Sequence, residues 1–217
     1  YTTAGSVNCV GVFGYTQNAT IRNLGVDNIL IQGYNYVGGL VGIHNSGTIT
    51  ACYAIGSVSG HKDMIGGLVG FNEGGMVSGC YASGAVSSVY DAGGLVGQNR
   101  GLVTTSYSTG TVNSSIHVGG LVGWSVSGTI ASCYATGSAT GSDGVGGLIG
   151  YNQQGKIFHS YSTGEPKGNY NTGGLCGAIA TGGIYEDVGN YWDTETSLYA
   201  TSAMGTGKTT AEMKTQS

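Results

Sequence analysis

A glycine-bracketed apolar block returns along the chain at a nearly constant spacing. It reads VGGLVG at Val37 and recurs in slightly altered form, with the glycine pair at Gly38, Gly66, Gly93, Gly119, Gly146 and Gly173. These positions lie 28, 27, 26, 27 and 27 residues apart, and a weaker copy, VGVFG, begins at Val10. A fixed period in this range indicates a repeat architecture.

The residues inside each unit are typical of short strands and turns. Apolar and β-branched residues stand in short runs that end at glycine, without a sustained helical spacing. A strand advances about 3.3 Å per residue, so one unit forms a coil of a few short strands, and stacked coils lie about 4.8 Å apart in parallel register. We therefore predict an all-β fold, a parallel β-solenoid (β-helix) of about seven coils.

Two regions of the chain are expected to differ. Residues 1–183 carry the solenoid repeats, whereas residues 184–217 break the period and are predicted to be an atypical capping segment whose end is truncated. Within that segment Thr209 and Glu212 have the spacing of a capping box, which predicts a short helix near Thr210. The run GTGKTT has Ser202 where a phosphate-binding loop needs its first glycine, so we interpret it as a capped turn.

Alignment of the units predicts the core. One column consists of leucines that should pack on one another from coil to coil: Leu40, Leu68, Leu95, Leu121, Leu148 and Leu175. Each is followed by a second apolar residue, and neighbouring strand residues point in opposite directions. Either a bend separates the two, which we favour, or one apolar column lies outside and is covered by a partner.

A column of small residues is followed by a column of tyrosines. The small residues are Cys52, Cys80, Ser106, Cys133 and Ser160, and the tyrosines are Tyr53, Tyr81, Tyr107, Tyr134 and Tyr161. Exchange of cysteine with serine indicates a tight site selected by size rather than metal ligation or catalysis. Cys52 and Cys80 should be adjacent in the stack, near enough to pair if their geometry allows, but we favour a ladder of free thiols. The tyrosines either pack inside or, as the small neighbours favour, face outward as a surface for sugar rings or a partner protein.

Acidic residues recur near one loop before the GGLVG block. They are Asp63, Asp91 and Asp143, with His117 and Asn171 nearby in other coils. These residues form either a weak cation or ligand edge or, as we favour, a solvated loop rim. No HExxH motif and no column of paired acids is present, so we predict no enzyme: no catalytic residue, no metal ligand and no cofactor.

Charge and hydropathy restrict the classes of partner that we expect. The net charge is −4 with only 7 basic residues, which disfavours nucleic acid, and no apolar run approaches the roughly 20 residues of a membrane span, so we expect no membrane insertion. The chain begins at Tyr1, which we interpret as a mature product or an excised piece. Threonine ladders of the kind that would suit ice binding are too irregular here to favour that function.

The recurrent GGLVG with the following [SC]-Y-[AS]-x-G resembles the GLUG repeat of large bacterial secreted and surface proteins, and NYWDTETS with GTGKTTAEMK resembles the tail of such arrays. The resemblance covers about residues 10–214. It implies an extracellular, non-catalytic module of adhesin-like or filamentous-haemagglutinin-like proteins, or one beside an immunoglobulin A metallopeptidase domain.

We therefore expect a structural or adhesive module, extracellular or at the cell surface, that presents or spaces a binding surface. Its expected partners are other copies of itself or a surface protein or glycan. Two alternatives stay open: a self-assembling subunit of an extracellular filament, and a β-helix that binds or cleaves polysaccharide.

Overall fold

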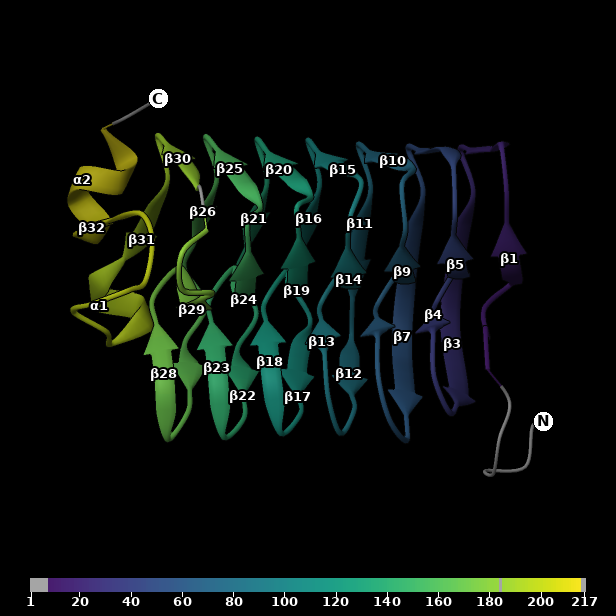
Figure 1. Ribbon diagram of the computed structural model, residues 1–217, viewed down its shortest axis with the longest axis horizontal. Helices are drawn as coiled ribbons and strands as arrows, with labels where there is room; N and C mark the ends of the chain where they lie inside the picture. The colour runs from purple at the N-terminus through teal and green to yellow at the C-terminus, as the bar shows by residue number, and fades with distance from the viewer. Residues whose placement is uncertain (1–7, 184, 216–217) are drawn as a thin grey trace.

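The computed structural model describes residues 8–183 and 185–215. The chain winds into a parallel β-solenoid of about seven turns, with the N-terminal strand at one end of the stack and two short helices at the other (Figure 1). Each strand pairs in parallel with the equivalent strand of the next coil, and equivalent residues are in register, as Val41 with Val69 and Val69 with Val96. The predicted fold class is confirmed.

Four parallel sheets run along the stack. Sheet I contains β4 (Val37–Gly38), β8 (Ile65–Gly66), β13 (Ala92–Gly93), β18 (Ile116–Gly119), β23 (Asp143–Gly146) and β28 (Tyr170–Gly173). Sheet II contains β1 (Phe13–Thr16), β5 (Val41–His44), β9 (Val69–Asn72), β14 (Val96–Asn99), β19 (Val122–Val126), β24 (Ile149–Gln153) and β29 (Cys176–Ile179).

The other two sheets complete each coil. Sheet III contains β2 (Ala19–Arg22), β6 (Gly47–Thr50), β10 (Met76–Ser78), β15 (Leu102–Thr104), β20 (Thr129–Ala131), β25 (Lys156–Phe158) and β30 (Glu186–Val188). Sheet IV contains β3 (Gly25–Gly33), β7 (Tyr53–Gly60), β11 (Tyr81–Ser83), β12 (Ala85–Ser87), β16 (Tyr107–Ser108), β17 (Thr111–Asn113), β21 (Tyr134–Ala135), β22 (Ala139–Thr140), β26 (Tyr161–Ser162), β27 (Pro166–Lys167), β31 (Tyr191–Asp193) and β32 (Thr206–Lys208).

The GGLVG block is a bend between sheets I and II. Leu40 and Val41 are both fully buried, and their backbone N–H groups both donate to the carbonyl of Leu68, at 2.9 and 3.0 Å. A bend lets two adjacent side chains point into the same interior, which an extended strand does not permit. The predicted bend and the buried leucine column, all six members of which are 0% exposed, are confirmed.

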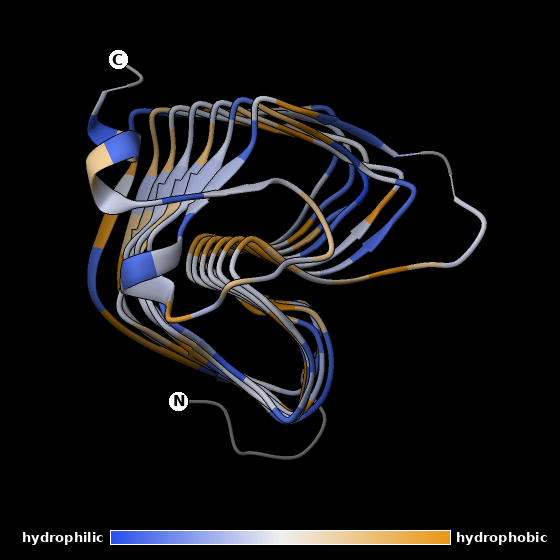
Figure 2. Ribbon diagram, turned by 90° about the vertical axis from the view of Figure 1, so that its left-hand side faces the viewer, coloured by the Kyte–Doolittle hydropathy of each residue, from blue (hydrophilic) through white to orange (hydrophobic). Residues whose placement is uncertain are grey.

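These bends divide the interior in two. A Cβ added at Gly67 would lie 2.9 Å from the Cβ of Ala82 on sheet IV, so the bend approaches the opposite strand closely and only glycine fits. One hydrophobic cluster holds the leucine column, and a second holds Val58, Val86 and the sheet I residues such as Val118. Figure 2, viewed along the stack, shows the coils superimposed and a central row of hydrophobic bends.

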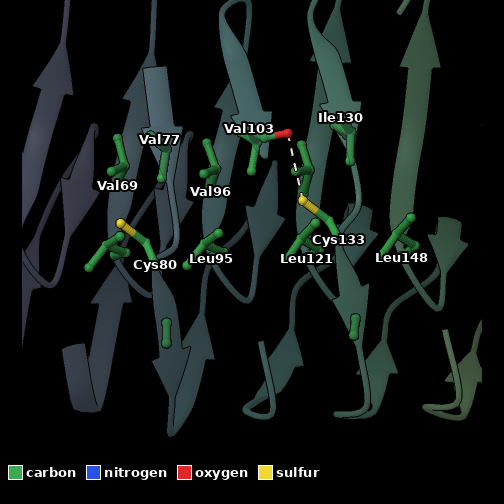
Figure 3. Close-up of a cluster of buried hydrophobic side chains, with 14 of the residues drawn as sticks. Val69, Val77, Cys80, Leu95, Val96, Val103, Leu121, Ile130, Cys133 and Leu148 are labelled. Carbon is green, nitrogen blue, oxygen red and sulfur yellow. Dashed lines mark hydrogen bonds between the residues drawn. The ribbon is translucent and has the colours of Figure 1, made fainter. Parts of the chain in front are cut away.

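The corner between sheets III and IV explains the column of cysteines and serines. The backbone N–H of Cys80 donates to Ser106 Oγ at 3.1 Å, and that of Cys133 donates to Ser160 Oγ at 3.1 Å. The thiol of Cys133 donates to the carbonyl of Val103 at 3.6 Å, as Figure 3 shows within the packed core. The position therefore requires a small side chain that also accepts a hydrogen bond from the preceding coil. The described cysteines are free thiols.

The C-terminal end of the stack is covered by its own chain. The residues between helix α1 (Thr194–Ser197) and β32 cross the last bend, where Gly174 N donates to Thr201 O and Ala203 N to Cys176 O, at 3.1 and 3.0 Å. Parallel pairing continues past the predicted boundary at residue 183, because β30 and β31 extend sheets III and IV. Trp192 is in register with Ser162, in the inward column that follows the tyrosines, and is 5% exposed, so a large side chain closes the core there.

Candidate functional site

The five tyrosines of the predicted ladder stand in register on sheet IV. Their rings stack at centroid separations of 4.8–5.2 Å with interplanar angles of 2–11°. The residues on either side of each ring point into the core, as Cys52 and Ala54 flanking Tyr53 do at 1% and 2% exposure. Because successive strand residues alternate sides, the tyrosines face outward.

Stacking decides which part of each ring a partner can reach. Each internal ring has both faces covered by its neighbours, so only ring edges and hydroxyl groups are open to the outside. At the N-terminal end, the ring of Tyr53 lies where a side chain at Gly25 would be, so that face is covered as well. The ladder therefore presents a row of hydroxyls and ring edges, and its internal rings offer no open face.

Two hydroxyls of the ladder, those of Tyr81 and Tyr134, have raised pKa values. Desolvation, followed by the neighbouring phenols Tyr107 and Tyr161, raises the pKa of Tyr134, and desolvation is also the main cause that raises the pKa of Tyr81. A tyrosine with a raised pKa remains neutral at physiological pH and both donates and accepts hydrogen bonds.

The C-terminal end of the ladder opens into a cleft of about 900 Å³. The cleft lies between β26, β31 and helix α2 (Thr210–Lys214), which Figure 1 shows together at the capped end. Tyr161 lines it and is the most exposed ring of the ladder, at 37%. The predicted capping box is confirmed, because Thr209 Oγ1 accepts from Glu212 N and Glu212 Oε2 accepts from Thr209 N.

A comparison with protein families supports the repeat assignment. The model of the GLUG motif matches residues 64–87, 114–140 and 141–165. Residues 64–165 are a GLUG-repeat region. Comparison with curated proteins and with solved structures found no match.

The predicted loop rim does not gather its three aspartates. Asp91 is in register with His117, whereas Asp143 is in register with Ile116, one position earlier in the repeat. Asp91 Oδ1 lies 2.7 Å from His117 Nδ1, and Asn171 Nδ2 donates to Asp143 Oδ1 at 2.7 Å. Burial, followed by the charge of Asp91, raises the pKa of Asp63.

These contacts make the rim a set of side-chain pairs. Over residues 8–183 and 185–215, no group of three or more His, Cys, Asp or Glu side chains is placed to hold a metal ion. Within the same residues, no helix is long and apolar enough to cross a membrane.

Sequence reasoning missed two features beside this rim. Phe71, Trp124 and Tyr151 share one position of the repeat, and the His117 ring lies 4.8 Å from Tyr151 and 5.5 Å from Trp124. A second column points inward from sheet II: His44, Asn72, Asn99, Ser125 and Asn152, all 0–1% exposed. Asn72 Nδ2 donates to Gly75 O at 3.0 Å, so this column holds the turn that follows. Its sequence signal is N-x-x-G at Asn72 and Asn152, shortened to N-x-G at Asn99.

Proposed function

We propose that this GLUG-repeat solenoid is a non-catalytic structural and adhesive module of an extracellular or cell-surface protein. The observation that carries the proposal is the tyrosine ladder, because five coils present the same outward side chain along one face of a stiff stack. A row of hydroxyls and ring edges suits contact with a surface protein or glycan. The low charge of the chain, 8% charged residues, also favours neutral partners.

The state of the acidic residues supports a non-catalytic role. Hydrolysis of a glycosidic bond needs two carboxyl groups about 5–10 Å apart and open to the substrate. Asp91 is 5% exposed and paired with His117, while Asp143 accepts from Asn171. We therefore favour presentation of a surface over cleavage of a polysaccharide.

The covered C-terminal end bears on the filament alternative. Polymerisation by stacking of coil ends needs an open strand edge at both ends of the subunit. Here the segment from Thr201 to Ala203 hydrogen-bonds to the last bend, and Trp192 and Met204 close the core beneath it. This arrangement favours a module that presents or spaces a binding surface over a subunit that stacks head to tail into a filament.

Two measurements test the proposal. Negative-stain electron microscopy over a dilution series should give isolated short rods at every concentration, and filaments that persist on dilution would replace the proposal with self-assembly. Incubation with starch, cellulose, chitin and pectin should release no new reducing ends or unsaturated products. Steady release from any of these polysaccharides would make the module an enzyme.

A further inference from the structure

The cleft beneath helix α2 differs from the rest of the tyrosine ladder because it exposes the face of a ring. Tyr134 covers one face of Tyr161 at 5.2 Å and 8°. Tyr191 follows in register on the next strand, yet its ring does not stack on Tyr161 as the other rings of the ladder do on their neighbours. The ammonium of Lys208 instead lies over the Tyr191 ring, 5.8 Å from the ring centroid.

The space beside Tyr161 has the size of a ligand site. Its volume of about 900 Å³ is within the range of pockets that hold small molecules. The walls come from three elements distant in sequence: β26, β31 and α2. The lining residues include Tyr161, Tyr191, Thr163, Thr210, Met213 and Lys214.

We propose that this cleft binds a sugar ring, stacked on the free face of Tyr161 as a sixth ring of the ladder. An aromatic face packs against the C–H groups of a pyranose, and the hydroxyl groups at the edge of the sugar need hydrogen-bonding partners. The cleft supplies an aromatic face at Tyr161, an adaptable apolar wall at Met213 and threonine hydroxyls around them.

The charges of the cleft disfavour a cationic ligand. Asp193 is the carboxylate that lines it, and its oxygens are already engaged. Oδ1 accepts from Glu195 N and Thr196 N at 2.9 and 3.2 Å, and Oδ2 accepts from Thr210 Oγ1 at 2.7 Å. These hydrogen bonds hold the pKa of Asp193 below its usual value despite burial, so the carboxylate serves the helix caps. Lys214 adds a positive charge to the lining, which suits a neutral or acidic sugar.

This inference deepens the proposed function by naming the ligand class at one end of the presenting surface, but the two can fail separately. Filament formation or polysaccharide cleavage would overturn the proposed function and leave sugar binding at Tyr161 untouched. Loss of sugar binding would leave the ladder as a surface for protein partners.

The test is saturation-transfer NMR on the full chain with four probes: maltopentaose, cellopentaose, chitopentaose and pentagalacturonic acid. We expect at least one probe to receive saturation, and Tyr161→Ala to weaken its binding at least tenfold. Tyr107→Ala is the matched control, because it removes a ladder ring whose two faces are both covered. That variant should bind the same probe within twofold of the parent chain.

Three results would overturn the inference. The first is the absence of saturation transfer to all four probes, and the second is equal weakening by both variants. The third is binding of N-acetyltryptophanamide at Tyr161 when no sugar binds, which would assign the cleft to aromatic side chains. Far-UV circular dichroism checks that each variant is folded. Tyr161→Phe keeps the ring face and should retain binding, which provides a test even where Tyr161→Ala is unfolded.

Discussion

The stacked tyrosines make a quantitative prediction about stability. Tyr107 stacks on Tyr81 at 5.0 Å and on Tyr134 at 4.8 Å, whereas Tyr161 stacks on one ring of the ladder only. A stacked aromatic pair contributes about 0.5–1.5 kcal/mol beyond area burial, so Tyr107→Val should lower the free energy of unfolding by about 1–3 kcal/mol and Tyr161→Val by about half of that. Valine keeps a β-branched side chain in the strand, which preserves strand propensity.

Urea unfolding measures this difference. Far-UV circular dichroism follows the sheets, while tryptophan fluorescence follows Trp124 in the repeats and Trp192 in the cap. A double-mutant cycle isolates the stacking itself: the neighbours Tyr107 and Tyr134 should couple by about 0.5–1.5 kcal/mol, and Tyr81 and Tyr134, two coils apart, by close to zero. Equal losses for the two single variants, or equal coupling for both pairs, would refute stacking as the source of stability.

Three further predictions concern buried positions, and urea unfolding measures the stability of each variant. Gly94→Ala should abolish or severely weaken folding, since its Cβ would meet the opposite strand at Ser108. Gly74→Ala should have a mild effect, because only one atom lies near its Cβ, at 3.1 Å. Similar urea midpoints for the two variants would contradict the close approach at Gly94. Burial raises the pKa of Cys80 to about 11, so this thiol should resist thiol reagents at pH 8 until urea is added. Cys80→Ser should change the free energy of unfolding little, because Ser106 occupies the same column and accepts the equivalent hydrogen bond. Cys80→Ala should lower the free energy of unfolding by about 1–3 kcal/mol, because the buried N–H of Cys52 loses its acceptor. Burial lowers the pKa of His44, so on acidification the unfolded chain takes up a proton before the folded protein does. The free energy of unfolding should therefore fall as pH drops below about 6.5. His44→Asn should make this dependence on pH weaker, and an unchanged dependence would assign it to other groups.

The repeat period was enough to predict the solenoid and its core. In a stack of parallel coils each residue contacts its equivalent one period away, so a constant spacing in the sequence becomes a constant register in space. This is why the leucine column, the apolar bend and the outward tyrosines could be derived from alignment of the units. The capping box at Thr209 was also predictable, because it depends on residues three positions apart.

Other features depend on contacts that no period encodes. The approach of the bend to Ala82 divides the interior in two, and it depends on how four sheets close around one another. The aspartates of the rim were grouped by sequence position, but a shift of one residue in register places Asp91 and Asp143 in different columns with different partners.

The sequence by itself determined the architecture and the row of tyrosines, because register in a solenoid follows from spacing alone. Only the tertiary structure decided which parts of that row are open to a partner. The stacking of the rings covers every internal face, whereas Tyr161, on which the Tyr191 ring does not stack, lines a cleft beside α2. Ring orientation and cap packing depend on neighbours in three dimensions, and the cap, where the repeat ends, has no period from which to derive them.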